Sequence, residues 1–282
     1  MDLAACSSRE DSPRDSVGDD GGRDASLDAR DADDAARACS TPAADAPWIT
    51  EVQEGIVARL SGKSPISSGL ISSDRASPAR RSAVSAYLRA ELSALDVAAS
   101  LQKYGTGTNV YGILEASAPS SANIVIGAHF DTVPGSPGAN DNATDVALVM
   151  AVARYLVSVD GRQSNVYFVF FDEEEVGLVG SAKFAAFLKE SAVSVTSVHT
   201  IDQVGWDKDG DRAIELERPS GDLYAEWVAS CDAAGLTMPL HLVGTGSTDH
   251  VSFRANGFSA IGITEEHVNG DTSPNYHKAT DT

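Results

Sequence analysis

The chain of 282 residues is long enough for one large α/β domain, or for one domain with a tail, and its 42% hydrophobic content is ordinary for a globular protein. Its formal net charge of −20 argues against nucleic acid as a partner and against an anionic membrane surface, since both need basic side chains. The sequence contains no apolar run of the roughly 18 residues that a membrane-spanning helix requires.

The acidity is uneven along the chain. Residues 1–46 carry 12 acidic side chains against 5 arginines, a net charge of −7, and almost no large apolar residues. Such a segment cannot bury enough apolar surface to offset the entropy lost on ordering. The sequence therefore predicts a disordered acidic tail over residues 1–46 and a folded domain over residues 47–282.

The segment Leu3-Ala4-Ala5-Cys6 is similar to a bacterial lipobox, in which the cysteine is lipidated and becomes the mature N-terminus. In that interpretation the tail is a lipoprotein tether, Cys6 is the one membrane anchor, and the protein is extracytoplasmic, either periplasmic, on the cell surface or secreted. Only Met1-Asp2 precede the motif, whereas a signal peptide needs a charged start and an apolar stretch, so a chance match stays open. Cys39 and Cys231 pair in an oxidising compartment or remain two free thiols.

After the tail, segments with apolar residues at three- and four-residue spacing alternate with short runs rich in β-branched and aromatic residues. Ser77-Pro78 supplies a start signal for the second helical segment. The predicted helices cover residues 49–60, 78–95, 145–157, 180–190 and 222–234. The predicted strands cover residues 97–101, 109–114, 123–128, 166–171, 195–201, 240–243 and 259–264.

This alternation predicts an α/β fold of three layers (α/β/α), with a mixed, mostly parallel sheet and helices on both faces. Residues 123–128 form a nearly continuous apolar run, as expected of a strand that is buried on both faces. Ligands of open α/β sheets bind beyond the carboxyl ends of the strands. Residues that directly follow the predicted strands are therefore candidates for a functional site.

Histidines and carboxylates stand at several of these positions. His129 follows the third predicted strand, Glu174 and Glu175 follow the fourth, Asp202 follows the fifth, and His277 lies after the last. Each alone is ordinary, since such residues often form hydrogen-bonded surface pairs or solvated charge runs. Imidazole and carboxylate groups together suit zinc or a similar divalent cation. Their convergence at one edge of a sheet predicts a metal site.

Five blocks of sequence make this pattern more specific. They read GAHFDTVPGSPGANDNATDVA, FFDEEEVGLVGSAKFA, TIDQVGWD, GSTDHVSF and PNYHKATDT. Their residues and order resemble the co-catalytic di-zinc aminopeptidases of peptidase family M28, clan MH, from about Trp48 to the C-terminus. The resemblance implies a zinc-exopeptidase-like fold and two Zn²⁺ ions per chain. The family usually continues beyond the point where this sequence stops, so we expect a truncation at the C-terminus.

Carried over position by position, the resemblance implies that the Asp141 carboxylate bridges the two metal ions. His129 and Asp202 then complete the shell of one ion, and Glu175 and His277 complete the shell of the other. A bridging carboxylate is the simplest way to hold two ions about 3.5–4 Å apart, the separation that clamps a water and a carbonyl oxygen. One histidine and one carboxylate per ion leave positions open for water and substrate.

The resemblance also implies roles for residues that do not ligate. Glu174 would be the general base, Asp131 would hydrogen-bond a metal-binding histidine, and Tyr276 would steady the oxyanion. Asp249 and His250 match a further block, which implies support of the pocket, with His250 hydrogen-bonded rather than bound to metal.

The three consecutive glutamates leave a second register open when the residues alone are considered. Glu173 would then be the base and Glu174 the ligand. The family pair directly precedes a triplet that matches Val176-Gly177-Leu178 in this chain. The resemblance therefore favours Glu174 as the base and Glu175 as the ligand.

From these residues we expect a zinc-dependent aminopeptidase, a metallopeptidase that removes N-terminal residues from peptides and acts as a monomer. Three alternatives stay open: a single-zinc acyltransferase similar to glutaminyl cyclase, a related di-zinc carboxypeptidase or dipeptidase, and a non-catalytic binding protein of the same fold. The full set of five candidate ligands favours two ions over one. A binding protein would be expected to have lost Glu174 or a ligand, and none is lost.

Overall fold

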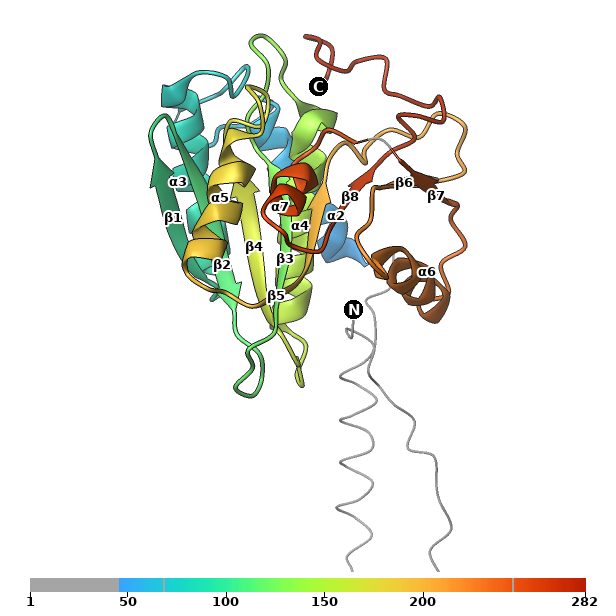
Figure 1. Ribbon diagram of the computed structural model, residues 1–282. Helices are drawn as coiled ribbons and strands as arrows, with labels where there is room; N and C mark the ends of the chain where they lie inside the picture. The colour runs from blue at the N-terminus through green and yellow to red at the C-terminus, as the bar shows by residue number, and fades with distance from the viewer. Residues whose placement is uncertain (1–45, 68, 245) are drawn as a thin grey trace, which may run out of the picture.

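The computed structural model describes residues 46–67, 69–244 and 246–282 (Figure 1). The helices are α2 (Pro47–Leu60), α3 (Pro78–Ala94), the π-helical turn η1 (Ala139–Ala143), α4 (Thr144–Val157), α5 (Val179–Glu190), α6 (Leu223–Ala233) and α7 (His250–Ala255). The strands are β1 (Ala98–Tyr104), β2 (Gly107–Leu114), β3 (Asn123–His129), β4 (Asn165–Phe171), β5 (Val195–Ile201), β6 (Ile214–Glu217), β7 (Leu240–Val243) and β8 (Ala260–Thr264).

The strands form one sheet in the order β1-β2-β4-β3-β5-β8-β6-β7. The central strands β4, β3, β5 and β8 run parallel to one another. At one edge β1, β2 and β4 pair antiparallel, and at the other β6 pairs antiparallel with β8 and parallel with β7. Figure 1 shows helices in front of and behind this sheet. The predicted α/β class, with a mixed and mostly parallel sheet, is confirmed.

Two hydrophobic cores hold the sheet between its helical layers. Buried side chains of α2, α3 and α4 pack against one face of the sheet, around Phe168 and Phe170 of β4. On the other face, Phe171 of β4 lies 6.2 Å from the ring of Phe184 in α5 and 5.7 Å from the ring of Phe253 in α7. β3, in the middle of the sheet, is buried at every position, which explains its nearly continuous apolar sequence.

Three elements of the structure were not predicted, namely the π-helical turn η1, β6 and α7. β6 reads IELE, in which apolar residues alternate with glutamates. Both glutamates are buried, because Glu215 accepts the N–H groups of Val268 and Asn269 and Glu217 accepts the hydroxyl of Thr248. α7 has six residues and is too short to show a helical period. The other predicted elements are present, with ends that differ by a few residues.

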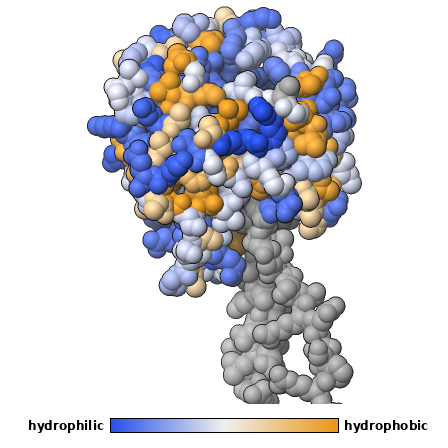
Figure 2. Space-filling view, viewed as in Figure 1, coloured by the Kyte–Doolittle hydropathy of each residue, from blue (hydrophilic) through white to orange (hydrophobic). Residues whose placement is uncertain are grey.

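The face of the molecule seen in Figure 2 is mixed in character. Hydrophobic residues form patches between hydrophilic ones, and apolar atoms are a normal part of a protein surface. Among the described residues, none of the helices has the length and apolar character needed to cross a membrane. Cys6, Cys39 and residues 1–45 of the predicted tail lie outside the described residues, whereas Cys231 is buried on α6.

Candidate metal centre and active site

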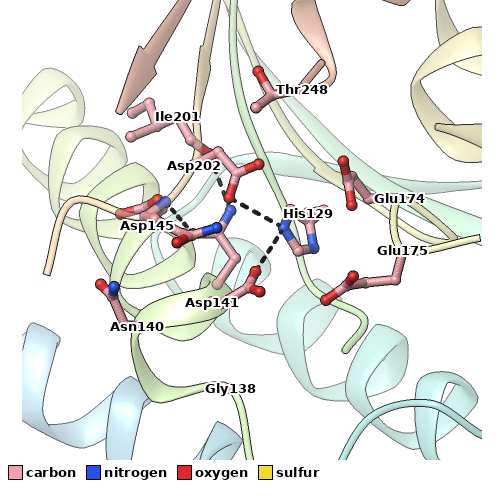
Figure 3. Close-up of polar contacts among 12 residues, drawn as sticks. His129, Gly138, Asn140, Asp141, Asp145, Glu174, Glu175, Ile201, Asp202 and Thr248 are labelled. Atoms are coloured by element: carbon pink, nitrogen blue, oxygen red, sulfur yellow. Dashed lines mark hydrogen bonds and ion pairs between the residues drawn. The ribbon is translucent and has the colours of Figure 1, made fainter. Parts of the chain in front are cut away.

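The carboxyl edge of the central strands gathers the side chains that the sequence singled out. Figure 3 labels His129, Asp141, Glu174, Glu175 and Asp202 among them. They come from the end of β3, from η1, from the loops after β4 and β5, and from the C-terminal segment, so that five separate stretches of chain meet. The five candidate ligands brought together are His129, Asp141, Glu175, Asp202 and His277.

Asp141 stands between two histidines. Its Oδ1 lies 3.3 Å from Nε2 of His129, and its Oδ2 lies 3.1 Å from Nε2 of His277. Asp202 Oδ1 lies 3.4 Å from the same His129 nitrogen, and Glu175 Oε2 lies 3.1 Å from the same His277 nitrogen. Within each group of three, one donor atom per residue lies within 4.8 Å of the others. The side chains thus form two groups that share Asp141, the grouping that the resemblance implies.

The donor set of these groups fits divalent cations. Nδ1 of His129 and Oδ1 of Asp202 are buried without a hydrogen-bond partner, which is rare for buried polar atoms. Burial raises the pKa of Glu175, and the Asp141 carboxylate raises it further. Burial also raises the pKa of Glu174, against the opposing effect of His129. Neighbouring carboxylates repel one another when they are ionised, and this repulsion raises their pKa values. A bound cation would relieve the repulsion, so the site favours positive charge.

The three consecutive glutamates face different surroundings. Glu173 contacts Nη2 of Arg81 at 2.8 Å and the hydroxyl of Thr106 at 2.7 Å, away from the two groups. Glu174 belongs to neither group and lies across from His129 in Figure 3. Glu175 is a member of the second group. This arrangement agrees with the register that the resemblance favours.

Asp131 makes two hydrogen bonds that the sequence did not predict. Its Oδ1 lies 3.5 Å from Nδ1 of His129, near this nitrogen but without a hydrogen bond to it, so the expected hydrogen bond stays a prediction. The same carboxylate accepts the backbone N–H of Glu174 at 3.0 Å and that of Glu175 at 3.2 Å. One side chain therefore ties the end of β3 to the loop after β4, and the placement of the histidine depends on the placement of the glutamates.

The turn that carries Asp141 is held by a residue that sequence reasoning missed. Asp281, which is buried, accepts the backbone N–H of Asn140 at 2.8 Å and that of Asp141 at 3.1 Å. Asn142 donates from Nδ2 to the Ile201 carbonyl oxygen at 3.0 Å. Asp281 lies in the block PNYHKATDT, and its place in this family-like block is the feature of the sequence that could have identified it.

Arg75 is a fully buried cation near the same turn, and no motif pointed to it. Its guanidinium donates to four backbone carbonyl oxygens. Burial lowers the pKa of Arg75 to about 10, although the Asp141 carboxylate opposes this, so the side chain is charged at neutral pH. The four acceptors are the carbonyls of Leu60 at 2.7 Å, Pro137 at 2.6 Å, Gly138 at 3.0 Å, and Phe130.

Arg75→Met is expected to lower the free energy of unfolding by about 3 kcal/mol or more, because several buried carbonyl groups lose their donor together. Urea unfolding measures the loss. Arg80→Met is the matched control, since Arg80 pairs with Asp74 near the surface at 2.6 Å and such pairs contribute about 0–1 kcal/mol. Equal losses in the two variants would contradict the role given to Arg75.

Tyr276 lies beside the second ligand group. Its ring centroid is 3.8 Å from that of His277, and 36% of the residue is exposed. Burial of its hydroxyl end, together with the carboxylates of the site, raises the pKa of Tyr276. The hydroxyl therefore stays protonated at neutral pH and can donate a hydrogen bond.

Asp249 and His250 are buried at the start of α7. Burial lowers the pKa of His250 to about 4, so its ring is neutral, and its Nδ1 lies 2.9 Å from the hydroxyl of Thr248. Neither residue belongs to a ligand group among the described residues. His250 is hydrogen-bonded, as the sequence suggested.

Comparison with known proteins identifies the family to which the chain belongs. Residues 109–282 match the model described as peptidase family M28. The chain belongs to peptidase family M28. This M28 chain is 32% identical over 182 residues to Aminopeptidase YwaD of Bacillus subtilis, a match that covers 62% of this chain and 40% of YwaD. It is 30% identical over 201 residues to the Probable lipoprotein aminopeptidase LpqL of Mycobacterium tuberculosis, covering 60% of this chain and 40% of LpqL. The M28 chain thus spans less than half the length of these relatives.

Solved structures resemble this M28 chain as well. BSAP, a zinc aminopeptidase from Bacillus subtilis, superposes with a TM-score of 0.57 at 26% identity and covers 62% of this chain and 44% of BSAP. LapA aminopeptidase of Legionella pneumophila gives a TM-score of 0.69 at 22% identity over 83% of this chain and 66% of LapA. A glutaminyl cyclase of Bacteroides thetaiotaomicron gives 0.67 at 17% identity over 82% and 89%. The last two likenesses show the fold alone.

Proposed function

We propose that the chain is a zinc-dependent aminopeptidase that removes N-terminal residues from peptides. The observation that carries the proposal is the Asp141 carboxylate, whose two oxygens face His129 and His277. The relatives YwaD and LpqL are named aminopeptidases, and BSAP is named a zinc aminopeptidase, which supports both the activity and the metal.

The metal-holding residues are assigned from the two groups. Asp141, His129 and Asp202 would hold one zinc ion, and Asp141, Glu175 and His277 would hold the other. When bound, such ions polarise the scissile carbonyl and make a water acidic enough to attack at neutral pH. The remaining residues of the site have to bind the peptide, move a proton and steady the developing charge.

Glu174 is proposed as the group that moves the proton. It lies across from His129 and belongs to neither ligand group, so its carboxylate is free to accept a proton from the attacking water. The same carboxyl can then protonate the leaving amine. The Tyr276 hydroxyl, kept protonated by its raised pKa, is proposed to donate to the oxyanion of the tetrahedral intermediate. Asp131 holds the Glu174 and Glu175 backbone in place.

A glutaminyl-cyclase-like acyltransferase is the second candidate, because a glutaminyl cyclase shares the fold. That reaction class was expected to need one zinc ion, and both ligand groups of this chain are complete. A di-zinc carboxypeptidase or dipeptidase would use a similar centre but would recognise a different end of the peptide. The metal stoichiometry and the end of the peptide that is attacked therefore separate these functions.

A substrate panel tests the proposal. Purified protein with added zinc should release nitroaniline from aminoacyl-nitroanilides and should leave N-acetylated versions intact, because the free amine is required. Peptides with an amidated C-terminus should still be cleaved, which a carboxypeptidase would not do. If the protein cyclised an N-terminal glutamine and hydrolysed none of the aminoacyl-nitroanilides, the aminopeptidase assignment would be wrong and the cyclase would be supported.

Residues 1–46 are proposed to be a tether that the activity does not need, and Cys6 a lipid anchor that places the domain outside the cytoplasm. LpqL, a relative named a probable lipoprotein, supports this placement. A chain starting at Pro47 is expected to keep its full aminopeptidase rate. Expressed behind a complete signal peptide, the full chain should partition into detergent, and Cys6→Ala should release it. Equal solubility of both forms would count against the anchor, and an unfolded Pro47 chain against the boundary.

A further inference from the structure

The loop that carries Glu174 and Glu175 begins with two other carboxylates, and both face α3. Nε of Arg81 in α3 lies 2.7 Å from Oδ1 of Asp172, and its Nη2 lies 2.8 Å from Oε1 of Glu173. All three of these side chains are buried. A guanidinium that reaches two carboxylates at once fixes both in direction, because its nitrogens are held in one plane.

The β1–β2 hairpin holds the same two carboxylates. The Thr106 hydroxyl donates to Oε2 of Glu173 at 2.7 Å, and the Thr108 N–H donates to Oδ2 of Asp172 at 2.9 Å. The Tyr104 hydroxyl donates to the Asp172 carbonyl oxygen at 2.9 Å. With the Arg81 contacts, three of the four carboxylate oxygens accept a hydrogen bond, and the fourth, Oδ1 of Asp172, is in an ion pair with Nε of Arg81. The start of the loop is thus determined by two elements that lie outside the metal centre.

The backbone conformation at Glu173 directs its side chain away from that of Glu174. Its φ of 61° lies in the left-handed region, which non-glycine residues adopt only when their surroundings hold them there. Glu173 is directed to Arg81, whereas the Glu174 N–H donates to Asp131 and its side chain faces His129. Without Arg81, the buried Glu173 carboxylate would keep the Thr106 hydroxyl as a hydrogen-bond donor but would lose its cation, which favours a rearrangement that brings it to another cation.

We propose that Arg81 is a positioning residue that determines which of the three consecutive glutamates enter the active site. By neutralising Glu173, Arg81 keeps this carboxylate from competing with Glu174 and Glu175 for the metal centre one residue away. The inference rests on the proposed function, since its effect on catalysis passes through Glu174 as the base.

Arg81→Ala is the first test, in the full chain loaded with zinc. Turnover is expected to fall by about 10–100-fold, the range seen when a supporting contact behind a metal site is lost. KM for an aminoacyl-nitroanilide should stay within about twofold, because substrate contacts are unchanged. The affinity for zinc, measured by titrating the metal-free chain, should fall by about 10–100-fold as well. Arg80→Ala, one position earlier on the same helix and paired with Asp74, is the matched control and should keep the original kcat.

The double variant Arg81→Ala/Glu173→Gln separates positioning from simple structural support. The neutral amide no longer competes for cations and can still accept the Thr106 hydroxyl, so kcat should recover most of what Arg81→Ala lost. If Arg81 only braced the fold, a second loss of contact would leave the double variant as slow as the single one or slower. That result would overturn the proposal.

Thr106→Val keeps the test decisive if Arg81→Ala does not fold. This variant removes one donor to Glu173 at the exposed tip of the hairpin, and kcat is expected to fall by about two- to tenfold. An unchanged kcat in Thr106→Val would then reject the inference, as would equal kcat in Arg81→Ala and Arg80→Ala. Failure of the proposed function looks different: the unchanged chain would show no peptidase activity, or Glu174→Gln would retain it.

Discussion

Glu174→Gln is expected to lower kcat by about 10²–10⁴-fold while the zinc content holds, because the amide keeps the size of the side chain but cannot accept a proton. KM should change little, since the contacts that bind the peptide remain. Glu174 belongs to neither ligand group, and this is why its loss should leave the metal in place. Steady-state kinetics and elemental analysis of the same preparation measure both quantities.

Glu175→Gln is the matched variant. In this variant the loss of zinc should come first and should cause the loss of activity. The substitution replaces an anionic oxygen, 3.1 Å from Nε2 of His277, with a weak neutral ligand. Excess zinc should restore part of the rate. If Glu174→Gln loses zinc while Glu175→Gln retains it, the register through the three glutamates is wrong by one residue.

Asp141→Ala is expected to remove both zinc ions, since each of the two ligand groups contains this carboxylate. The purified protein should bind about two zinc equivalents per chain before the change and close to none after it, and peptidase activity should disappear with the metal. Far-UV circular dichroism should be unchanged, because the side chain lies at the edge of the sheet, not inside its hydrophobic cores.

Asp202→Asn is the control for this result. Asp202 belongs to the first group alone, so the second group keeps all of its residues and the stoichiometry should fall to about one. A ratio near one in the unchanged protein, with no further loss in Asp202→Asn, would count against two ions and favour the cyclase-like alternative.

The site could be located from the sequence because its residues follow predicted strands, and strands are predicted from local patterns. β3 and β4 are apolar runs that end in polar residues, and the edge of a parallel sheet brings such ends together whatever the loops do. His129 and Glu175 could therefore be placed near each other without knowledge of the loops. The assignment of Asp141 as the shared residue needed the family resemblance, since Asn140-Asp141-Asn142 reads as an ordinary turn.

The supporting residues could not be predicted in the same way. Arg81 and Glu173 are 92 residues apart, and Arg75 reaches carbonyls up to 63 residues away. Nothing in the sequence around an arginine shows which distant backbone groups it will meet once buried. β6 was missed for a related reason, because Glu215 and Glu217 find their hydrogen-bond partners 53 and 31 positions later in the chain.

The contacts of Asp281 set an order of events for the newly made chain. Asp281 holds the turn at Asn140 and Asp141 from 140 residues further along. At the usual rate of protein synthesis, roughly 10–30 s pass between the synthesis of the turn and the synthesis of Asp281. β3, β4 and the helices beside them can pair during this interval, but the two halves of the metal centre cannot close. We therefore expect the metal centre to close later than β3 pairs with β4, once the segment that carries His277 and Asp281 has been made.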